Sequence, residues 1–145
     1  FECPILVNDV IYYDDFFKQS NIKEVEKEEL LAKSDIVTLH IPLDDSTRNL
    51  LTAEKLSLMK SDAILINTAR GDLLDEKALK NMLMNGELGG AALDVFSIEP
   101  PEDQELLELA NFIVTPHIGG SANESIMAMG RAAIVGLKKY GDVLN

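Results

Sequence analysis

The stretch ILINTARGDLLDEKAL, residues 64–79, decides the fold. Its apolar beginning, Ile64 to Ile66, predicts a buried β-strand, and the loop Asn67 to Gly71 leads at once into a segment of helical period. A buried strand that passes through a short loop into a helix is the unit from which parallel sheets are built. Arg70 is therefore expected at the carboxyl end of a strand, as a brace for the loops or as a binder of an anion.

Capping residues and apolar periodicity predict three helices. The helix of the opening stretch has Asp75 as its N-cap and Gly86 as its stop residue. Ser121 and Glu124 match the S-x-x-E capping box at the start of the last helix. The predicted helices run from Asp75 to Gly86, from Thr52 to about Met59, and from Ser121 to about Tyr140.

Short apolar runs alternate with these helices along the whole chain. This pattern indicates repeated βα units and an α/β fold with a parallel sheet. No linker or internal repeat divides the 145 residues, so a single domain is expected. The predicted strands are Ile5–Asn8, Ile22–Val25, Ile36–Ile41, Ala63–Asn67, Gly90–Val95 and Phe112–Thr115.

Composition excludes several classes of protein. A net charge of −12 argues against a nucleic-acid surface, which needs clustered Lys and Arg. No apolar run approaches the length of a membrane span, so no membrane partner is expected. A single cysteine, Cys3, cannot form an internal disulfide, which favours the cytoplasm.

Polar residues follow several of the predicted strands. In open parallel sheets, ligands bind in the crevice beyond the carboxyl ends of the strands. We therefore expect one crevice to collect these residues, although each has an ordinary structural alternative. The residues are Asp9, His40, Arg70, Asp94, Glu99 and His117.

Asp9 ends an apolar strand, as does the acid that binds the adenosine ribose in dinucleotide folds. An acid in this place would repel a 2′-phosphate and so favour NAD over NADP. Its alternative is an ordinary turn or capping residue.

Three further residues of this set, His117, Glu99 and Arg70, suit an acid/base site. His117 precedes two glycines and is either a general acid/base or a structural hydrogen bonder. Glu99 either supports that imidazole or is merely solvated. Arg70 offers a planar fork that matches a carboxylate, with a salt bridge or a backbone contact as its alternative.

Four runs in order carry a family resemblance: SDIVTLHIPLDDSTRNLLT, AILINTARGDLLDEKAL, GAALDVFSIEPP and VTPHIGGSANES. Together they resemble the NAD-binding domain of the D-isomer-specific 2-hydroxyacid dehydrogenases, with phosphoglycerate and glycerate dehydrogenases among its members. Arg70 and Glu99 are 29 positions apart, and Glu99 and His117 are 18 apart, as in that group. The resemblance implies a Rossmann-like three-layer parallel sheet, NAD as cofactor and a small D-2-hydroxy acid or 2-oxo acid as substrate.

The resemblance also assigns roles to single residues. Arg70 would bind the substrate's carboxylate and carbonyl, His117 would protonate the carbonyl oxygen, and Glu99 would keep His117 protonated. No residue is assigned to a metal. The implied cofactor contacts are Asp9 at the ribose, Ile41 and Pro42 at the adenosine, Thr47 near the phosphates, Thr68 and Ala69 with Arg70 beside the nicotinamide, Asp94 at its carboxamide, and His117, Gly119 and Gly120 beside its ring.

The chain departs from the family in one respect that bears on activity. The Gly-rich fingerprint would lie about 20 residues before Asp9 and so ahead of Phe1. The first strand and helix of the nucleotide fold and the separate substrate domain are then missing, and residues 1–145 form a partial NAD-binding domain. The strand ending at Asp9 and the strand Ile36–Ile41 either pair directly or leave a gap that a partner fills. The isolated chain is expected to be inactive.

Two other functions compete with the dehydrogenase. One is a catalytically silent relative, a remnant or co-repressor-like protein that binds a nucleotide or a protein. The other is a flavodoxin-like module with an unrelated ligand, which the ordered Arg70, Glu99 and His117 disfavour. By resemblance, members of the family pair as homodimers through this domain.

Overall fold

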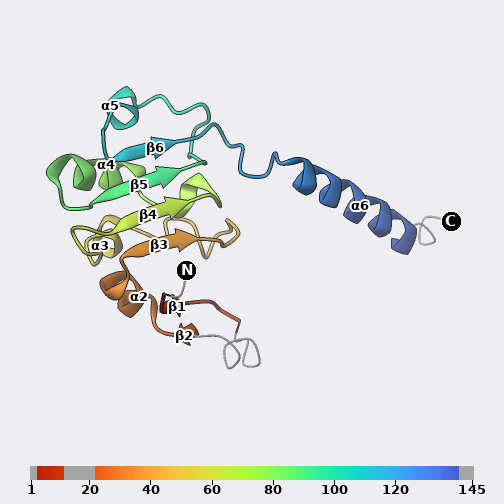
Figure 1. Ribbon diagram of the computed structural model, residues 1–145, viewed down its shortest axis with the longest axis horizontal. Helices are drawn as coiled ribbons and strands as arrows, with labels where there is room; N and C mark the ends of the chain where they lie inside the picture. Colours follow the sequence, from red (N-terminus) through yellow and green to blue (C-terminus); the bar gives the residue numbers. More distant parts are fainter. Residues whose placement is uncertain (1–2, 12–21, 141–145) are drawn as a thin grey trace.

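The computed structural model describes residues 3–11 and 22–140 (Figure 1). All six predicted strands are present, and each is one or two residues shorter than predicted because pairing ends before the apolar run does. The strands are β1 (Ile5–Val7), β2 (Ile22–Glu24), β3 (Ile36–Leu39), β4 (Ile64–Asn67), β5 (Gly90–Leu93) and β6 (Phe112–Val114).

The strands form two parallel sheets. One holds β1 and β2, and the other has the order β3-β4-β5-β6. Parallel sheets with flanking helices confirm the predicted Rossmann-like α/β fold. Among the described residues β1 and β3 are not hydrogen-bonded neighbours, so the predicted alternative of direct pairing between these two strands is wrong.

The helix of the opening stretch is confirmed at both ends. It is α4, Glu76–Asn85, and the Asp75 carboxylate accepts the backbone N–H of Ala78 as an N-cap. Gly86 ends the helix with a φ of 69°, a left-handed conformation that glycine adopts without strain. The remaining elements are α2 (Lys27–Lys33), α3 (Ala53–Leu56), the 3-10 turn η1 (Gly71–Leu73), α5 (Gln104–Leu107) and α6 (Asn123–Tyr140).

Two of the predicted helix boundaries need correction. Thr52 does cap α3 by accepting the N–H of Lys55, but this helix ends at Leu56 rather than near Met59. The last helix begins at Asn123, and the carbonyl of Ala122 accepts the N–H of Ile126. Ala122 is therefore the cap position, and the prediction that Ser121 caps α6 is wrong by one residue.

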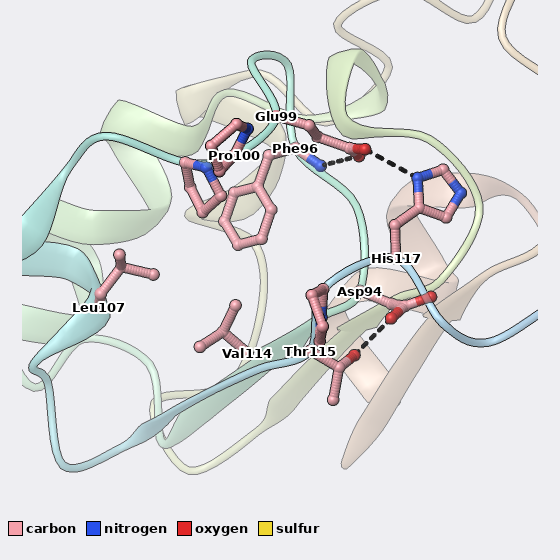
Figure 2. Close-up of a pocket in the computed structure, with 10 residues that line it drawn as sticks. Asp94, Phe96, Glu99, Pro100, Leu107, Val114, Thr115 and His117 are labelled. Atoms are coloured by element: carbon pink, nitrogen blue, oxygen red, sulfur yellow. Dashed lines mark hydrogen bonds and ion pairs between the residues drawn. The ribbon is translucent and has the colours of Figure 1, made fainter.

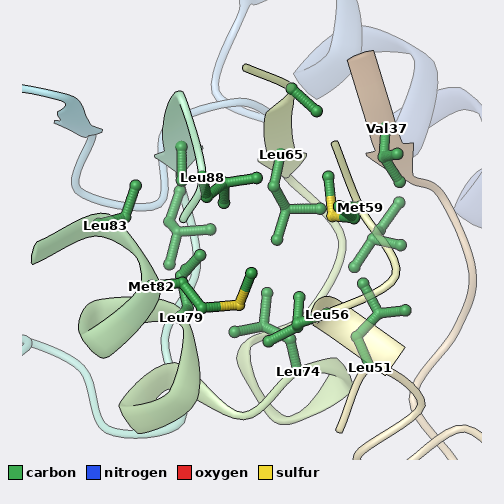
Figure 3. Close-up of a cluster of buried hydrophobic side chains, with 14 of the residues drawn as sticks. Val37, Leu51, Leu56, Met59, Leu65, Leu74, Leu79, Met82, Leu83 and Leu88 are labelled. Carbon is green, nitrogen blue, oxygen red and sulfur yellow. The ribbon is translucent and has the colours of Figure 1, made fainter. Parts of the chain in front are cut away.

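The hydrophobic core lies on one face of the four-stranded sheet (Figure 3). Val37 and Leu65 point from β3 and β4 toward helices α3 and α4, which contribute Leu56 and Leu79. Burial of such side chains contributes about 1.5–3 kcal/mol each relative to exposure. All buried members of this core cluster belong to residues 31–112, so neither β1 nor β2 takes part in it.

Helix α6 extends away from the sheets (Figure 1). Its described side chains are mostly exposed, including the apolar Ile126, Met129 and Leu137. Within residues 3–11 and 22–140, no helix combines the length and apolar character that crossing a membrane requires.

Candidate functional site

The loop that follows β4 is fixed by a buried asparagine. The Asn67 side chain is fully buried, and its oxygen accepts the N–H of Ala69 at 3.0 Å. Its amide nitrogen donates to the carbonyl of Arg70 at 2.8 Å. Sequence reasoning missed this role, although an Asn at the end of a strand is a known signature of such a local turn.

Arg70 is exposed at the end of that loop. One Nη1 hydrogen bond reaches the carbonyl of the preceding Ala69 at 2.6 Å. None of the ion pairs among the described residues involves Arg70. The salt-bridge alternative for Arg70 therefore has no support among the described residues, whereas the hydrogen bond to Ala69 is the backbone contact of its other alternative. That contact uses one of the five N–H groups of the guanidinium, so most of its fork remains available to a ligand. Thr68 beside it is exposed and Ala69 is half-buried.

Gly71 brings the loop of residues 67–71, called the arginine loop below, into contact with the loop that carries Glu99. A Cβ atom at position 71 would lie 2.0 Å from the carbonyl carbon of Phe96 and 2.3 Å from the nitrogen of Ser97. Only glycine permits this approach of two backbones. The N–H of Phe96 in turn donates to Glu99 Oε1 at 3.0 Å, so the two loops are held in a fixed relation.

Glu99 and His117 form a direct pair (Figure 2). The distance between His117 Nδ1 and Glu99 Oε2 is 2.8 Å. An ionised carboxylate only accepts hydrogen bonds, so Nδ1 carries the hydrogen and Nε2 is left to face a ligand. The hydrogen bond from His117, followed by that from the Phe96 N–H, holds the pKa of Glu99 below its ordinary value. Glu99 is thus anionic near neutral pH and orients the imidazole.

Asp94 organises the turn behind His117. It is buried at the end of β5, and its carboxylate accepts hydrogen bonds from the Thr115 hydroxyl, the Ile118 N–H and the Gly119 N–H. Burial disfavours the charged form of Asp94, but these three hydrogen bonds outweigh it and lower the pKa of Asp94 below its ordinary value. A buried anion is therefore stabilised directly beside the pair formed by His117 and Glu99.

A cavity of about 590 Å³ adjoins this pair (Figure 2). Apolar side chains form most of its wall, and polar groups lie at the side where His117 and Glu99 meet. The lining residues are Asp94, Phe96, Glu99, Pro100, Pro101, Leu107, Val114, Thr115, Pro116 and His117.

The glycines after His117 leave room for a flat ligand. A Cβ at Gly119 would lie 2.9 Å from Asp94 Oδ2, whereas Gly120 faces open space. Three of the roughly four acceptor positions of the Asp94 carboxylate are used by the chain, so one remains for a ligand N–H. These features fit an amide-bearing ring such as nicotinamide.

The residues predicted to contact the ribose, the adenosine and the phosphates make local contacts within their own loops. Asp9 follows β1, is exposed, and accepts the N–H of Ile11 at 3.0 Å, which is the turn contact of its structural alternative. The Thr47 hydroxyl donates to the carbonyl of Pro42 at 2.8 Å and closes the loop after β3. Its hydrogen is therefore committed to the loop rather than to a phosphate. Ile41 is half-buried in that loop.

The structure thus divides the predicted residues into two groups. Arg70, Glu99, His117, Asp94 and Gly119 are joined by an unbroken chain of backbone contacts and hydrogen bonds. The residues predicted for the ribose, the adenosine and the phosphates follow β1 and β3, two strands of different sheets. They are Asp9 after β1, and Ile41, Pro42 and Thr47 after β3. His40, at the end of β3, has its Nε2 3.0 Å from the Thr38 hydroxyl. Among the described residues, no three His, Cys, Asp or Glu side chains are grouped to hold a metal.

Comparison with known proteins identifies a matching domain. Residues 1–119 match the family described as D-isomer specific 2-hydroxyacid dehydrogenase, NAD binding domain. The chain is 46% identical over 118 residues to a glycerate dehydrogenase of Methylorubrum extorquens, covering 79% of this chain and 37% of the relative. It is 48% identical over 111 residues to a D-3-phosphoglycerate dehydrogenase of Methanocaldococcus jannaschii, covering 77% and 21%.

Solved structures agree with the sequence relatives. The NAD-complexed form of a D-isomer specific 2-hydroxyacid dehydrogenase from Lactobacillus delbrueckii ssp. bulgaricus superposes with a TM-score of 0.81 at 30% identity. The superposition covers 94% of this chain and 45% of that protein. The chain therefore spans less than half the length of each of these three proteins.

Proposed function

The chain belongs to the D-isomer specific 2-hydroxyacid dehydrogenase family through its NAD-binding domain, and we propose that its residues serve hydride transfer between NAD and a small D-2-hydroxy acid or 2-oxo acid. The observation that supports this most is the fixed relation of three groups. The Arg70 loop contacts the Phe96–Ser97 backbone, Phe96 binds Glu99, and Glu99 orients His117.

The chemistry of the reduction assigns one role to each side chain. NAD, when bound, supplies or accepts the hydride. The Arg70 fork binds the carboxylate of the 2-oxo acid and attracts the negative charge that grows on the carbonyl oxygen. His117 delivers its Nε2 proton to that oxygen, and in the oxidation of a hydroxy acid the same nitrogen takes the proton up. Glu99 holds the ring through Nδ1 and stabilises its protonated form.

We also propose which residues face the cofactor. Thr68, Ala69, Gly119 and Gly120 border the nicotinamide side, and the free acceptor position of Asp94 suits the carboxamide. Asp9 is proposed for the adenosine ribose, Ile41 and Pro42 for the adenosine side, and Thr47 for a position near the phosphates, where its hydroxyl hydrogen stays with the Pro42 carbonyl.

The proposal includes a limit on what these 145 residues do alone. The sequence has no glycine before Gly71, so a Gly-rich phosphate loop of the kind that opens dinucleotide folds is not among them. We expect weak NAD binding and no turnover by the isolated chain. Titration calorimetry with NAD tests this, and a saturable isotherm at micromolar NAD would contradict it.

A chimera tests the proposed activity. Residues 22–119 replace the matching segment of the Methylorubrum extorquens glycerate dehydrogenase, and NADH oxidation is followed with glyoxylate as a simple 2-oxo acid. We expect turnover, and a loss in kcat/KM of at least about 100-fold for His117→Ala and for Arg70→Ala, within the range of positioned acid/base groups. Lys77→Ala, at an exposed position on α4, is the matched control and should retain activity.

The outcomes separate the dehydrogenase from the silent relative. A folded chimera without turnover would support the catalytically silent alternative. A chimera whose turnover is unchanged by His117→Ala would still be a dehydrogenase, but it would contradict the acid/base role proposed for His117. A homodimer that forms through this domain and a cytoplasmic location complete the proposal, and light scattering on the chimera tests the first.

A further inference from the structure

His117 adopts a backbone conformation that needs support. Its φ is 53°, in the left-handed region, which residues with a Cβ rarely occupy. Such a conformation is unfavourable for a residue with a Cβ and persists only where the surrounding structure enforces it. The conformation matters because it sets the direction in which the imidazole leaves the chain toward Glu99.

The two N–H groups that follow His117 both bind one carboxylate. The Ile118 N–H donates to Asp94 Oδ1 at 2.9 Å, and the Gly119 N–H donates to Asp94 Oδ2 at 2.8 Å. We propose that Asp94 is a positioning residue, whose carboxylate clamps the 117–119 turn and so keeps His117 against Glu99 before any cofactor is bound.

Asp94 is itself firmly placed. It is buried, and its own N–H donates to the carbonyl of Asn67 at 3.0 Å, which ties it to the start of the arginine loop. The Thr115 hydroxyl donates to Oδ1 from the neighbouring strand end. The clamp therefore connects His117 to the same buried asparagine that fixes Arg70.

Gly119 is the second half of the clamp. A Cβ at this position would lie 2.9 Å from Asp94 Oδ2, which is closer than real Cβ contacts. The glycine thus allows the backbone to approach the carboxylate closely enough for the N–H of residue 119 to donate.

This role differs from that of a carboxamide acceptor. A carboxylate offers about four acceptor positions, and three of them accept hydrogen bonds from the chain itself. A cofactor amide would engage only the fourth. The inference relies on the proposed role of His117, but it concerns the chain without NAD or substrate.

The substitution Asp94→Asn tests the clamp, because it keeps the shape and removes one anionic acceptor. The asparagine NH₂ cannot accept, so it leaves one of the two turn N–H groups without a partner. The measured quantity is the pKa of Glu99, obtained by ¹³C NMR titration of its side-chain carboxyl in the full 145-residue chain.

The sign of the pKa change discriminates the two possible roles. The hydrogen bond from His117 is the largest cause of the lowered pKa of Glu99, with a smaller one from the Phe96 N–H, while the charge of Asp94 acts in the opposite direction. Loss of the clamp releases His117 and raises the pKa of Glu99. Loss of a mere neighbouring charge lowers it. We expect an upward shift, and a downward shift or none would overturn the proposal.

Two further variants complete the test. Thr115→Val removes the third hydrogen bond but leaves both turn contacts, and the pKa of Glu99 should not rise; a rise equal to that of Asp94→Asn would overturn the clamp. If Asp94→Asn does not fold, Gly119→Ala pushes the turn away from the intact carboxylate and should raise the pKa of Glu99 in the same direction. The titration uses the chain without ligands, so its failure is distinct from a failure of the chimera to turn over.

Discussion

The four-stranded sheet and the two-stranded sheet of this chain differ in what holds them. Strands β3 to β6 contribute buried side chains to one core cluster, together with α3, α4 and α5, and every buried member of that cluster comes from residues 31–112. The pair β1 and β2 has a partly exposed Ile5 and contributes nothing to that cluster. The two sheets share one parallel pattern but not one core.

The difference extends to the candidate site. The proposed catalytic groups follow β4, β5 and β6, where loops are tied by buried polar side chains such as Asn67 and Asp94. Asp9 follows β1 and binds only its own turn among the described contacts. We infer that a residue proposed to bind a ligand is held firmly where the strand before it packs into the core.

The largest effect is expected from removing packing in the four-stranded sheet. Leu65→Ala opens a cavity at a fully buried position and should lower the free energy of unfolding by about 2–5 kcal/mol. Ile5→Ala in β1 changes a half-exposed side chain and should cost about 0.5 kcal/mol or less. Urea unfolding followed by circular dichroism measures both. Equal losses would show that the two sheets share one core.

The contact between the arginine loop and the Glu99 loop should be nearly as sensitive. Gly71→Ala places a Cβ against the Phe96 and Ser97 backbones, and overpacking of this kind costs about 1–3 kcal/mol or more. Gly130→Ala is the matched control, because a Cβ there meets nothing within 4 Å and alanine favours the helix. Thermal unfolding compares the two variants. A Gly71→Ala protein as stable as the Gly130→Ala protein would mean that the two loops are not in fixed contact.

Much of the fold could be predicted from local patterns. The six strands follow from apolar runs between turn residues, and α4 follows from Asp75 and Gly86, because caps and periodicity act within a few positions. The ends of strands and of α3 and α6 depend on where pairing and packing stop, which no local pattern contains. The sequence leaves open whether β1 and β3 pair directly or are separated by a gap, and the structure rules out direct pairing between them.

The candidate site was predictable in its residues but not in its connections. Arg70, Glu99 and His117 were found from their types and spacing, since the family resemblance fixes their order. The buried Asn67 amide and the left-handed His117 were not, because both depend on hydrogen bonds between residues that the fold brings together. Asp94 was assigned to the cofactor, and its three contacts with the chain became visible only in three dimensions.

The smallest effect is expected in acid, where protonation of Asp94 weakens its hydrogen bonds with the 117–119 turn. Burial alone would raise the pKa of Asp94, but hydrogen bonds from Thr115, Gly119 and Ile118 lower it below the ordinary value. The unfolded-state pKa of an Asp carboxyl group is about 3.9. Because the pKa of Asp94 is lower in the folded state, its ionised carboxylate stabilises the fold above the unfolded-state pKa. This contribution is lost as the pH falls through the folded-state pKa. The amide signals of Ile118 and Gly119 should therefore titrate with a midpoint below pH of about 3.9 in ¹H–¹⁵N spectra, and the transition should be absent in Asp94→Asn. A midpoint above that pH would mean that the hydrogen bonds of the turn do not stabilise the Asp94 carboxylate. The loops after β4, β5 and β6 would then be held less firmly than the packing of their strands suggests.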